Sequence, residues 1–179
     1  MEETAKSGHI VRIVNLGSNE HQAAPKDTEF ASLDEINRDD GPNGQYGRSK
    51  LGAILHARYL ATHITAEHPR ILANSVHPGF VDTKASTFDI HEAYPLGGYM
   101  MSVAMKPFQK SQLEGCVSAM YAATATERSG KYICVPARIE DGSELAQSNE
   151  LAEQLMRLTE KVLKDKLEAV GMKFALEFY

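Results

Sequence analysis

Apolar residues along this chain gather into short continuous runs and longer helical stripes, and the two kinds of segment alternate. The runs rich in β-branched residues predict buried strands at 10–16, 70–76 and 131–135. Glycine or proline follows each run closely, which is typical of a strand that ends in a loop. Strands that alternate with helices at this spacing favour an α/β fold, with a parallel sheet of about three strands and flanking helices.

The spacing of apolar residues predicts three long helices, at 46–67, 111–124 and 148–170. Two apolar stripes run along the first, so we expect it to be buried on more than one side. The last has one stripe that begins at Leu151, and Gly171 is placed to end it. In helix 111–124 the residues expected to face inward are Leu113, Val117, Met120 and Tyr121.

The segments between these elements are read as loops. Residues 19–44 are polar and rich in turn formers, so we predict that they run over the surface. Residues 80–112 contain a Gly97-Gly98 pair and several methionines, which suits a mobile segment with an apolar side, although ordinary core packing explains the same pattern.

Composition narrows the function classes. With 179 residues, of which 42% are hydrophobic, we expect one soluble domain over 1–179. The net charge of −5 argues against a nucleic-acid partner. No apolar run is long enough to span a bilayer, and the amino terminus lacks the signal-peptide pattern, so we expect a cytoplasmic protein, with association at a membrane surface left open. Cys116 and Cys134 have no metal-site spacing, and both are interpreted as small core residues.

Candidate chemistry begins with Tyr46 and Lys50, which lie four positions apart on a predicted helix and therefore share a face. A nearby cation favours the phenolate, lowers the pKa of a tyrosine and makes it a usable proton donor. Chance supplies this spacing easily, and a surface pair is the plain alternative. The context adds weight, because Ser18, the turn leading to Tyr46 and the segment 78–83 all fall at the carboxyl edge of the predicted sheet, where parallel sheets bind ligands.

At this point the sequence resembles the short-chain dehydrogenase/reductase family. Three motifs carry the resemblance in the family's order, and it extends over nearly the whole chain. They are Ile13-Val14-Asn15-Leu16-Gly17-Ser18, Tyr46-Gly47-Arg48-Ser49-Lys50 and His77-Pro78-Gly79-Phe80-Val81-Asp82-Thr83. The long insert between the first two is similar to retinol-dehydrogenase-like members, and the fold implied is a partial Rossmann-like sheet.

The resemblance implies catalytic roles for Ser18, Tyr46 and Lys50. Tyr46 would be the proton donor in carbonyl reduction, Lys50 would lower its pKa and bind the nicotinamide ribose, and Ser18 would hold the substrate oxygen. Val81 and Thr83 would contact the nicotinamide end of the cofactor. The implied cofactor is NADP or NAD, with NADP favoured by family analogy, and the implied substrate is a small apolar carbonyl or alcohol.

The family's Thr-Gly-x-x-x-Gly-x-Gly turn, which receives the pyrophosphate, does not occur in these 179 residues. We therefore expect weak dinucleotide binding by this chain alone, and an open edge on strand 10–16. A second hypothesis follows: a catalytically inactive truncated family remnant that acts as an interaction protein. A homo-oligomer formed through helix 46–67 is one way to cover its apolar faces.

Other chemistry has less support. The histidines lack a His-Glu-x-x-His pattern, and His56 and His63 have no obvious carboxylate partner in sequence, so we predict packing or surface roles and no metal. His77 is read as a strand-end residue, with contact to the cofactor region as the alternative. A Ser18 hydrolase is disfavoured because Gly-x-Ser-x-Gly is absent.

Overall fold

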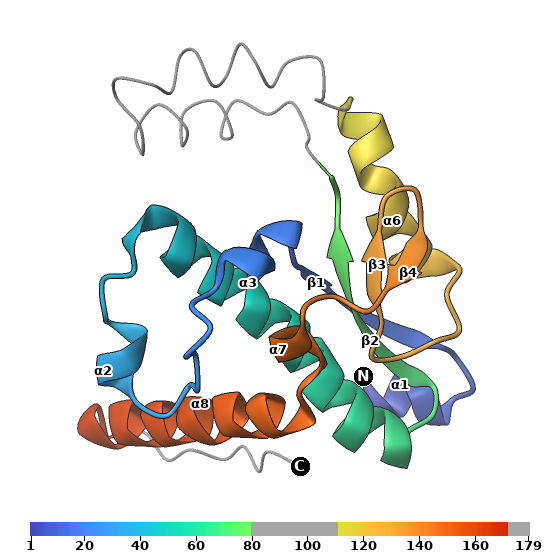
Figure 1. Cartoon of the computed structure of the whole chain (residues 1–179). Coiled ribbons are helices and arrows are strands. Elements are labelled where there is room, and N and C mark those ends of the chain that lie inside the picture. Colours follow the sequence, from blue (N-terminus) through green and yellow to red (C-terminus); the bar gives the residue numbers. More distant parts are fainter. Residues whose placement is uncertain (80–110, 172–179) are drawn as a thin grey trace.

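The computed structural model describes residues 1–79 and 111–171 (Figure 1). The strands are β1 (Val11–Leu16), β2 (Ile71–His77), β3 (Tyr132–Cys134) and β4 (Arg138–Glu140). The long helices are α3 (Gly41–Leu60), α6 (Gln112–Thr124) and α8 (Asn149–Ala169). Shorter helical segments are α1 (Glu2–Lys6), the 3₁₀ helix η1 (Asn19–Ala23), α2 (Leu33–Ile36), the π-helical turn η2 (Ala61–Thr65) and α7 (Glu144–Gln147).

The four strands form one mixed sheet in the order β1-β2-β3-β4. β1 pairs with β2 in parallel, from Val11 opposite Ile71 onward, and β2 pairs with β3 in parallel up to His77 opposite Cys134. The predicted α/β class and the three predicted strands are confirmed. β4 was not predicted; it pairs antiparallel with β3 after a tight turn in which Ala137 has a φ of 79°.

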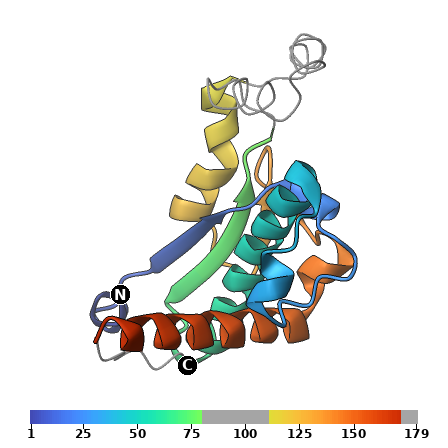
Figure 2. The ribbon, with the colours of Figure 1, turned by 90° about the vertical axis from the view of Figure 1, so that its left-hand side faces the viewer.

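Helices cover both faces of this sheet (Figures 1 and 2). α6 lies on one face, α3 lies on the other, and α8 packs against the outside of α3. The expectation that the helix carrying Tyr46 is buried on several sides is confirmed, because α3 lies between the sheet and α8. Its buried apolar residues are Leu51, Ile54, Leu55, Ala57 and Tyr59. The stripe on α8 is confirmed too, since Leu151 and Met156 are buried in the core that α3 shares with α8.

The start of α3 corrects one expectation. Tyr46 was predicted to open the helix, yet the helix begins at Gly41, so Tyr46 lies in its second turn. Pro42 occupies the first turn, where a missing backbone N–H costs nothing and the fixed φ suits a helix. A proline that reads as a loop residue in sequence therefore starts the helix here.

The orientation of α6 corrects a second expectation. Gly115, Ser118 and Ala122 are its buried residues, whereas Leu113, Val117 and Met120 are exposed, Leu113 by 81%. The small residues let the helix approach the sheet closely, and Ser118 Oγ donates to the carbonyl of His77 at 3.1 Å. The three large apolar residues form an exposed stripe on the far side of the helix. Cys116, expected in the core, is exposed as well, while Cys134 is buried as expected.

The polar segment before α3 corrects a third expectation, since it packs into the molecule. His21, Thr28 and Phe30 are each no more than 3% exposed, and Phe30 joins the core beside Leu51. Apolar anchors of this kind cannot be recognised from composition when polar residues surround them.

Two charged side chains, Glu35 and Arg48, hold this segment in place. The Glu35 carboxylate accepts backbone N–H groups from residues 29, 30 and 31 at 2.8, 3.1 and 2.7 Å. Burial alone raises the pKa of Glu35, but these donors and Arg48 outweigh it, and the pKa is lowered overall. Arg48 is buried, pairs with Asp40 and donates to the carbonyls of residues 35, 36 and 38. Glu35 thus fixes the turn at residues 29–31, and Arg48 ties the segment to α3.

β1 is an edge strand of the sheet that the described residues form, as expected. Leu16 at its carboxyl end is 60% exposed. In the described part of the chain, no helix combines the length and apolar character that crossing a bilayer requires.

Candidate active site

Tyr46 and Lys50 face the same side of α3, as their spacing predicted. The Lys50 ammonium lies 5.3 Å from the centre of the Tyr46 ring, which is a cation–π distance. The same ammonium donates to the Leu16 carbonyl at 3.2 Å. Lys50 is therefore tethered to the carboxyl end of β1 and holds its charge against Tyr46, whose side chain is about half exposed, at 49%.

Ser18 follows β1 directly and caps η1. Its hydroxyl accepts the backbone N–H of Glu20 at 3.2 Å, and the side chain is buried. A serine hydroxyl has one proton and two acceptor sites, so this bond leaves its proton available to a ligand oxygen.

Gly47 brings η1 against α3. A Cβ at this position would lie 2.6 Å from the backbone nitrogen of Ala24 and 2.7 Å from the carbonyl oxygen of Glu20. Only a residue without a side chain permits this approach. The helix that Ser18 caps and the helix that carries Tyr46 are thereby held in contact, at the residue next to Tyr46 and at Glu20, Ala23 and Ala24 of the Ser18 turn.

His21 is a site residue that the sequence analysis did not single out. It is 1% exposed, and its Nδ1 lies 2.6 Å from the Ser18 carbonyl oxygen. Its Nε2 accepts the backbone N–H of Ser143 at 3.0 Å, so the ring is the neutral tautomer with the proton on Nδ1. His21 therefore ties the Ser18 turn to the segment before α7. The surrounding polar loop gave no signal that this histidine is buried.

Asn15 also links β1 to α3. Its amide nitrogen donates to the Ala53 carbonyl and to His56 Nδ1, both at 3.0 Å. Burial lowers the pKa of His56, which suits an uncharged ring that accepts this bond. Asn15 and His56 thus have packing roles, as predicted for His56.

His63 has a carboxylate partner that the sequence did not reveal. Its Nε2 lies 2.6 Å from Glu153 Oε1 on α8, and its ring stacks on Tyr59 with 4.2 Å between ring centres. The expectation that His63 lacks a carboxylate partner is therefore wrong. Within residues 1–79 and 111–171, no cluster of three metal-ligating side chains occurs.

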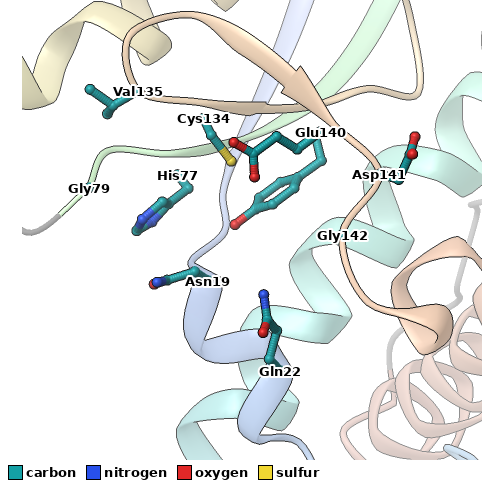
Figure 3. Close-up of a pocket in the computed structure, with 10 residues that line it drawn as sticks. Asn19, Gln22, His77, Gly79, Cys134, Val135, Glu140, Asp141 and Gly142 are labelled. Carbon is teal, nitrogen blue, oxygen red and sulfur yellow. The ribbon is translucent and has the colours of Figure 1, made fainter.

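A cavity of about 630 Å³ opens at the carboxyl edge of the sheet (Figure 3). It begins one residue after Ser18, and it reaches the ends of β2 and β3 and the segment after β4. Its volume lies within the range of small-molecule sites. The residues that line it are Asn19, Gln22, His77, Gly79, Tyr132, Cys134, Val135, Glu140, Asp141 and Gly142.

The lining is largely polar. Figure 3 shows Asn19 and Gln22 from η1, His77 from the end of β2, and the Glu140 carboxylate around one space, whereas Asp141 points away. Tyr46, Lys50 and Ser18 are not among the lining residues, although Ser18 is the direct neighbour of Asn19. The cavity therefore lies beside the catalytic candidates and does not enclose them. Val81 and Thr83, the predicted cofactor contacts, lie outside the described residues, as does most of the predicted substrate loop 80–112.

Ser18 directly follows β1, and Lys50 reaches the carboxyl end of the same strand while its ammonium lies over the Tyr46 ring. Comparison with known proteins finds similarity to oxidoreductases, among them proteins named as short-chain dehydrogenases/reductases. Over 171 residues, 93% of this chain, it is 51% identical to "Putative oxidoreductase bli-4, mitochondrial" of Neurospora crassa. It is 29% identical over 177 residues, 92% of the chain, to a short-chain dehydrogenase/reductase of Armillaria gallica. Over 86 residues, 46% of the chain, it is 40% identical to the chloroplastic short-chain dehydrogenase TIC 32 A of Brassica napus.

The chain is homologous to oxidoreductases of the short-chain dehydrogenase/reductase family. It spans 42% of the Neurospora protein, 54% of the Armillaria protein and 26% of the Brassica protein. No family model matches it.

Proposed function

We propose that this chain carries the proton-transfer part of an NAD(P)-dependent oxidoreductase that interconverts a small carbonyl compound and its alcohol. The observation that carries the proposal is the position of Lys50, whose ammonium bonds to the end of β1 and lies over the Tyr46 ring. Homology to oxidoreductases over most of the chain supports it. Because the chain spans about half or less of those relatives, the activity of a whole protein is part of the proposal.

In the proposed reaction, Tyr46 donates its phenolic proton to the substrate carbonyl oxygen. Ser18 donates a hydrogen bond to the same oxygen and holds it in position while negative charge develops there. Lys50 stabilises the phenolate that remains on Tyr46. The nicotinamide cofactor, when bound, supplies the hydride that the carbonyl carbon gains, so one hydride and one proton convert the carbonyl to the alcohol. Alcohol oxidation is the reverse, with Tyr46 as the base.

The residues of this chain fit the nicotinamide and ribose half of such a cofactor. An ammonium has three donors, and the bond to Leu16 uses one, so Lys50 has donors for the ribose hydroxyls next to Tyr46. Val81 and Thr83 remain the proposed contacts of the nicotinamide end, and NADP is preferred by family analogy alone. No residue of this chain is assigned to the pyrophosphate. The proposed substrate has a mainly apolar frame, and the proposed compartment is the cytoplasm, whereas the Neurospora relative is named as mitochondrial.

A second candidate function is a non-catalytic interaction protein. Two observations favour it: β1 is an edge strand, and α6 exposes the apolar stripe of Leu113, Val117 and Met120. An unpaired strand edge and an exposed apolar helix face both invite a protein partner. The predicted homo-oligomer through helix 46–67 stays a prediction, and the apolar residues of that helix lie largely in the chain's own core.

One set of measurements separates the two functions. The purified chain is titrated with NADPH and with NADH, and ketone reduction is followed by the loss of cofactor absorbance. The enzyme proposal predicts that Tyr46→Phe abolishes turnover while the fold persists, and that Tyr121→Phe on α6 leaves turnover unchanged. Turnover that survives Tyr46→Phe contradicts the enzyme proposal. Micromolar binding of either cofactor contradicts a purely non-catalytic role.

A further inference from the structure

The cavity contains one buried hydroxyl that the proposed reaction does not use. Tyr132 lines the cavity and is 5% exposed, and no hydrogen-bond partner for its hydroxyl occurs among the described residues. Burial raises the pKa of Tyr132 above its ordinary value, and Cys134 on the same strand adds to the rise. The phenol is therefore a neutral donor and acceptor at physiological pH. A buried polar group without a partner is costly, and such groups often mark a ligand position.

The ring of Tyr132 is held beside the catalytic turn. A Cβ added at Gly17 would lie 3.4 Å from Tyr132 Cε2, and the ring meets His21 edge-on with 5.2 Å between ring centres. Gly17 directly precedes Ser18, so the Tyr132 ring packs next to the turn that presents the serine hydroxyl. The ring that carries the Tyr132 hydroxyl is thus fixed beside the turn proposed to hold the reacting oxygen.

The groups around the Tyr132 hydroxyl define what it would bind. The amides of Asn19 and Gln22 both donate and accept, while Glu140 only accepts. Among the described lining residues the charged side chains are acidic, Glu140 and Asp141, and of these two Glu140 points into the cavity. This lining matches hydroxyl groups, and it repels a carboxylate or phosphate.

We propose that the Tyr132 hydroxyl anchors a second oxygen of the substrate, so that the preferred substrates are neutral carbonyl compounds that also carry a hydroxyl group. This inference rests on the proposed oxidoreductase function and narrows its substrate class from apolar carbonyls in general. The apolar frame of the substrate would lie between the reacting carbonyl and the hydroxyl.

The test measures equilibrium binding, so that it does not depend on turnover. Cyclohexanone, 4-hydroxycyclohexanone and 4-oxocyclohexanecarboxylate share one frame, and each is titrated into the full chain by ligand-observed NMR. Small ligands of this size bind in the millimolar range when they fit a site. We expect the hydroxyketone to bind about tenfold more tightly than cyclohexanone, the effect of one well-made hydrogen bond to a buried group, and the carboxylate to bind most weakly.

Tyr132→Phe then removes the hydroxyl and keeps the ring. The variant should keep or raise the urea midpoint of the original chain, because the lost hydroxyl is buried and has no partner in the fold. It should bind cyclohexanone unchanged and lose the preference for the hydroxyketone. Glu140→Gln is expected to reduce the discrimination against the carboxylate and to retain the preference for the hydroxyketone.

Three outcomes overturn the inference: equal binding of the three ketones, no binding of any of them at about 10 mM, or a hydroxyl preference that survives Tyr132→Phe. In the last two cases the cavity hydroxyl contacts water only. Failure of the oxidoreductase function is recognised separately, since it removes turnover and the effect of Tyr46→Phe on turnover while leaving these binding constants unchanged.

Discussion

Gly47 offers a sharp test of how the candidate site is assembled. It lies between Tyr46 and Lys50 in sequence, and the backbone of η1 packs directly against its Cα. In Gly47→Ala the new methyl group would lie 2.6 to 2.8 Å from three backbone atoms, which belong to Ala24, Glu20 and Ala23. Backbone atoms cannot rotate away as the end of a side chain can. The substitution therefore has to push η1 away from α3.

Two opposing effects determine how much Gly47→Ala changes the free energy of unfolding. Alanine stabilises a helix interior relative to glycine by about 0.5–1 kcal/mol. Ordinary contact begins near 3.4 Å, so η1 must move by somewhat less than about 1 Å, and overpacking of this kind costs about 1–3 kcal/mol. We expect Gly47→Ala to lower the free energy of unfolding by about 1–2 kcal/mol in net terms.

Gly52 on the same helix is the matched control. A Cβ there would meet Leu155 Cδ2 at 3.8 Å and Phe30 Cζ at 4.0 Å, which are ordinary contacts. Gly52→Ala should therefore gain the helix propensity without the clash and raise the stability by up to about 1 kcal/mol. Urea denaturation followed by circular dichroism measures both variants. If the two alanines change the stability in the same direction by the same amount, η1 does not pack against Gly47 as described.

Three further predictions concern other parts of the fold. In Glu35→Gln, three backbone N–H donors face either the amide N–H₂ group or the amide oxygen, which is a weaker acceptor than a carboxylate. The free energy of unfolding at neutral pH should therefore fall by about 1–3 kcal/mol. The pKa of Glu35 is lowered in the folded state, so the ionised carboxylate stabilises the fold above its ordinary pKa of 4.5. This stabilisation is lost as the pH falls through the lowered pKa, and the urea midpoints of the variant and the original chain should therefore converge in acid. A gap that stays constant with pH would contradict this role. Leu113 is 81% exposed, so Leu113→Ser should change the free energy of unfolding by less than about 0.5 kcal/mol. Ala122 is 0% exposed, so Ala122→Leu should lower it by about 1–3 kcal/mol. A larger loss from Leu113→Ser than from Ala122→Leu would show that the other face of α6 is buried. A thiol reagent at pH 8 should label the exposed Cys116 quickly and Cys134 only on unfolding. The reason is that burial, and to a smaller extent Glu140, raises the pKa of Cys134 to about 12. Equal labelling rates of the two thiols would refute this difference.

The parts of the fold that the sequence predicted share one property: local pattern decides them. The β-branched run at 10–16 and the run at 70–76 became β1 and β2 within about one residue, since a short apolar run bounded by turn residues is stable as a buried strand. β4 could not be found in this way. It is three residues long and exposed to solvent, and it forms because the chain after β3 folds back on that strand.

The parts that the sequence misassigned depend on long-range contacts. Hydrophobicity alone predicts that Leu113 and Met120 are buried. In the structure, however, the face of α6 that packs against the sheet is the one with small side chains, around Ser118, because these allow a close approach. Phe30 was taken for a surface residue because its neighbours are polar. Their backbone donors are satisfied by Glu35, which a reading of local pattern cannot show.

The candidate site divides in the same way. Ser18, Tyr46 and Lys50 were proposed from motifs, and the structure places all three around the carboxyl end of β1. His21 and Tyr132 were not proposed, because a buried histidine in a polar loop and a tyrosine in a short strand resemble ordinary residues in sequence. Only their positions beside Ser18 and in the cavity give them a role.

The four-residue spacing of Tyr46 and Lys50 gains its meaning from the residues between them. Gly47 and Arg48 are both buried. Gly47 lies on the flank of the helix that admits η1, whereas Arg48 lies opposite the tyrosine and the lysine, pairs with Asp40 and bonds to carbonyls around α2. The buried side thereby fixes the rotation and position of α3 relative to the Ser18 turn. With α3 so fixed, the exposed side must present the tyrosine and the lysine to the carboxyl end of β1. An isolated tyrosine and lysine at this spacing could form on any surface helix; the pair here is held because the same helical turn is anchored on its other face.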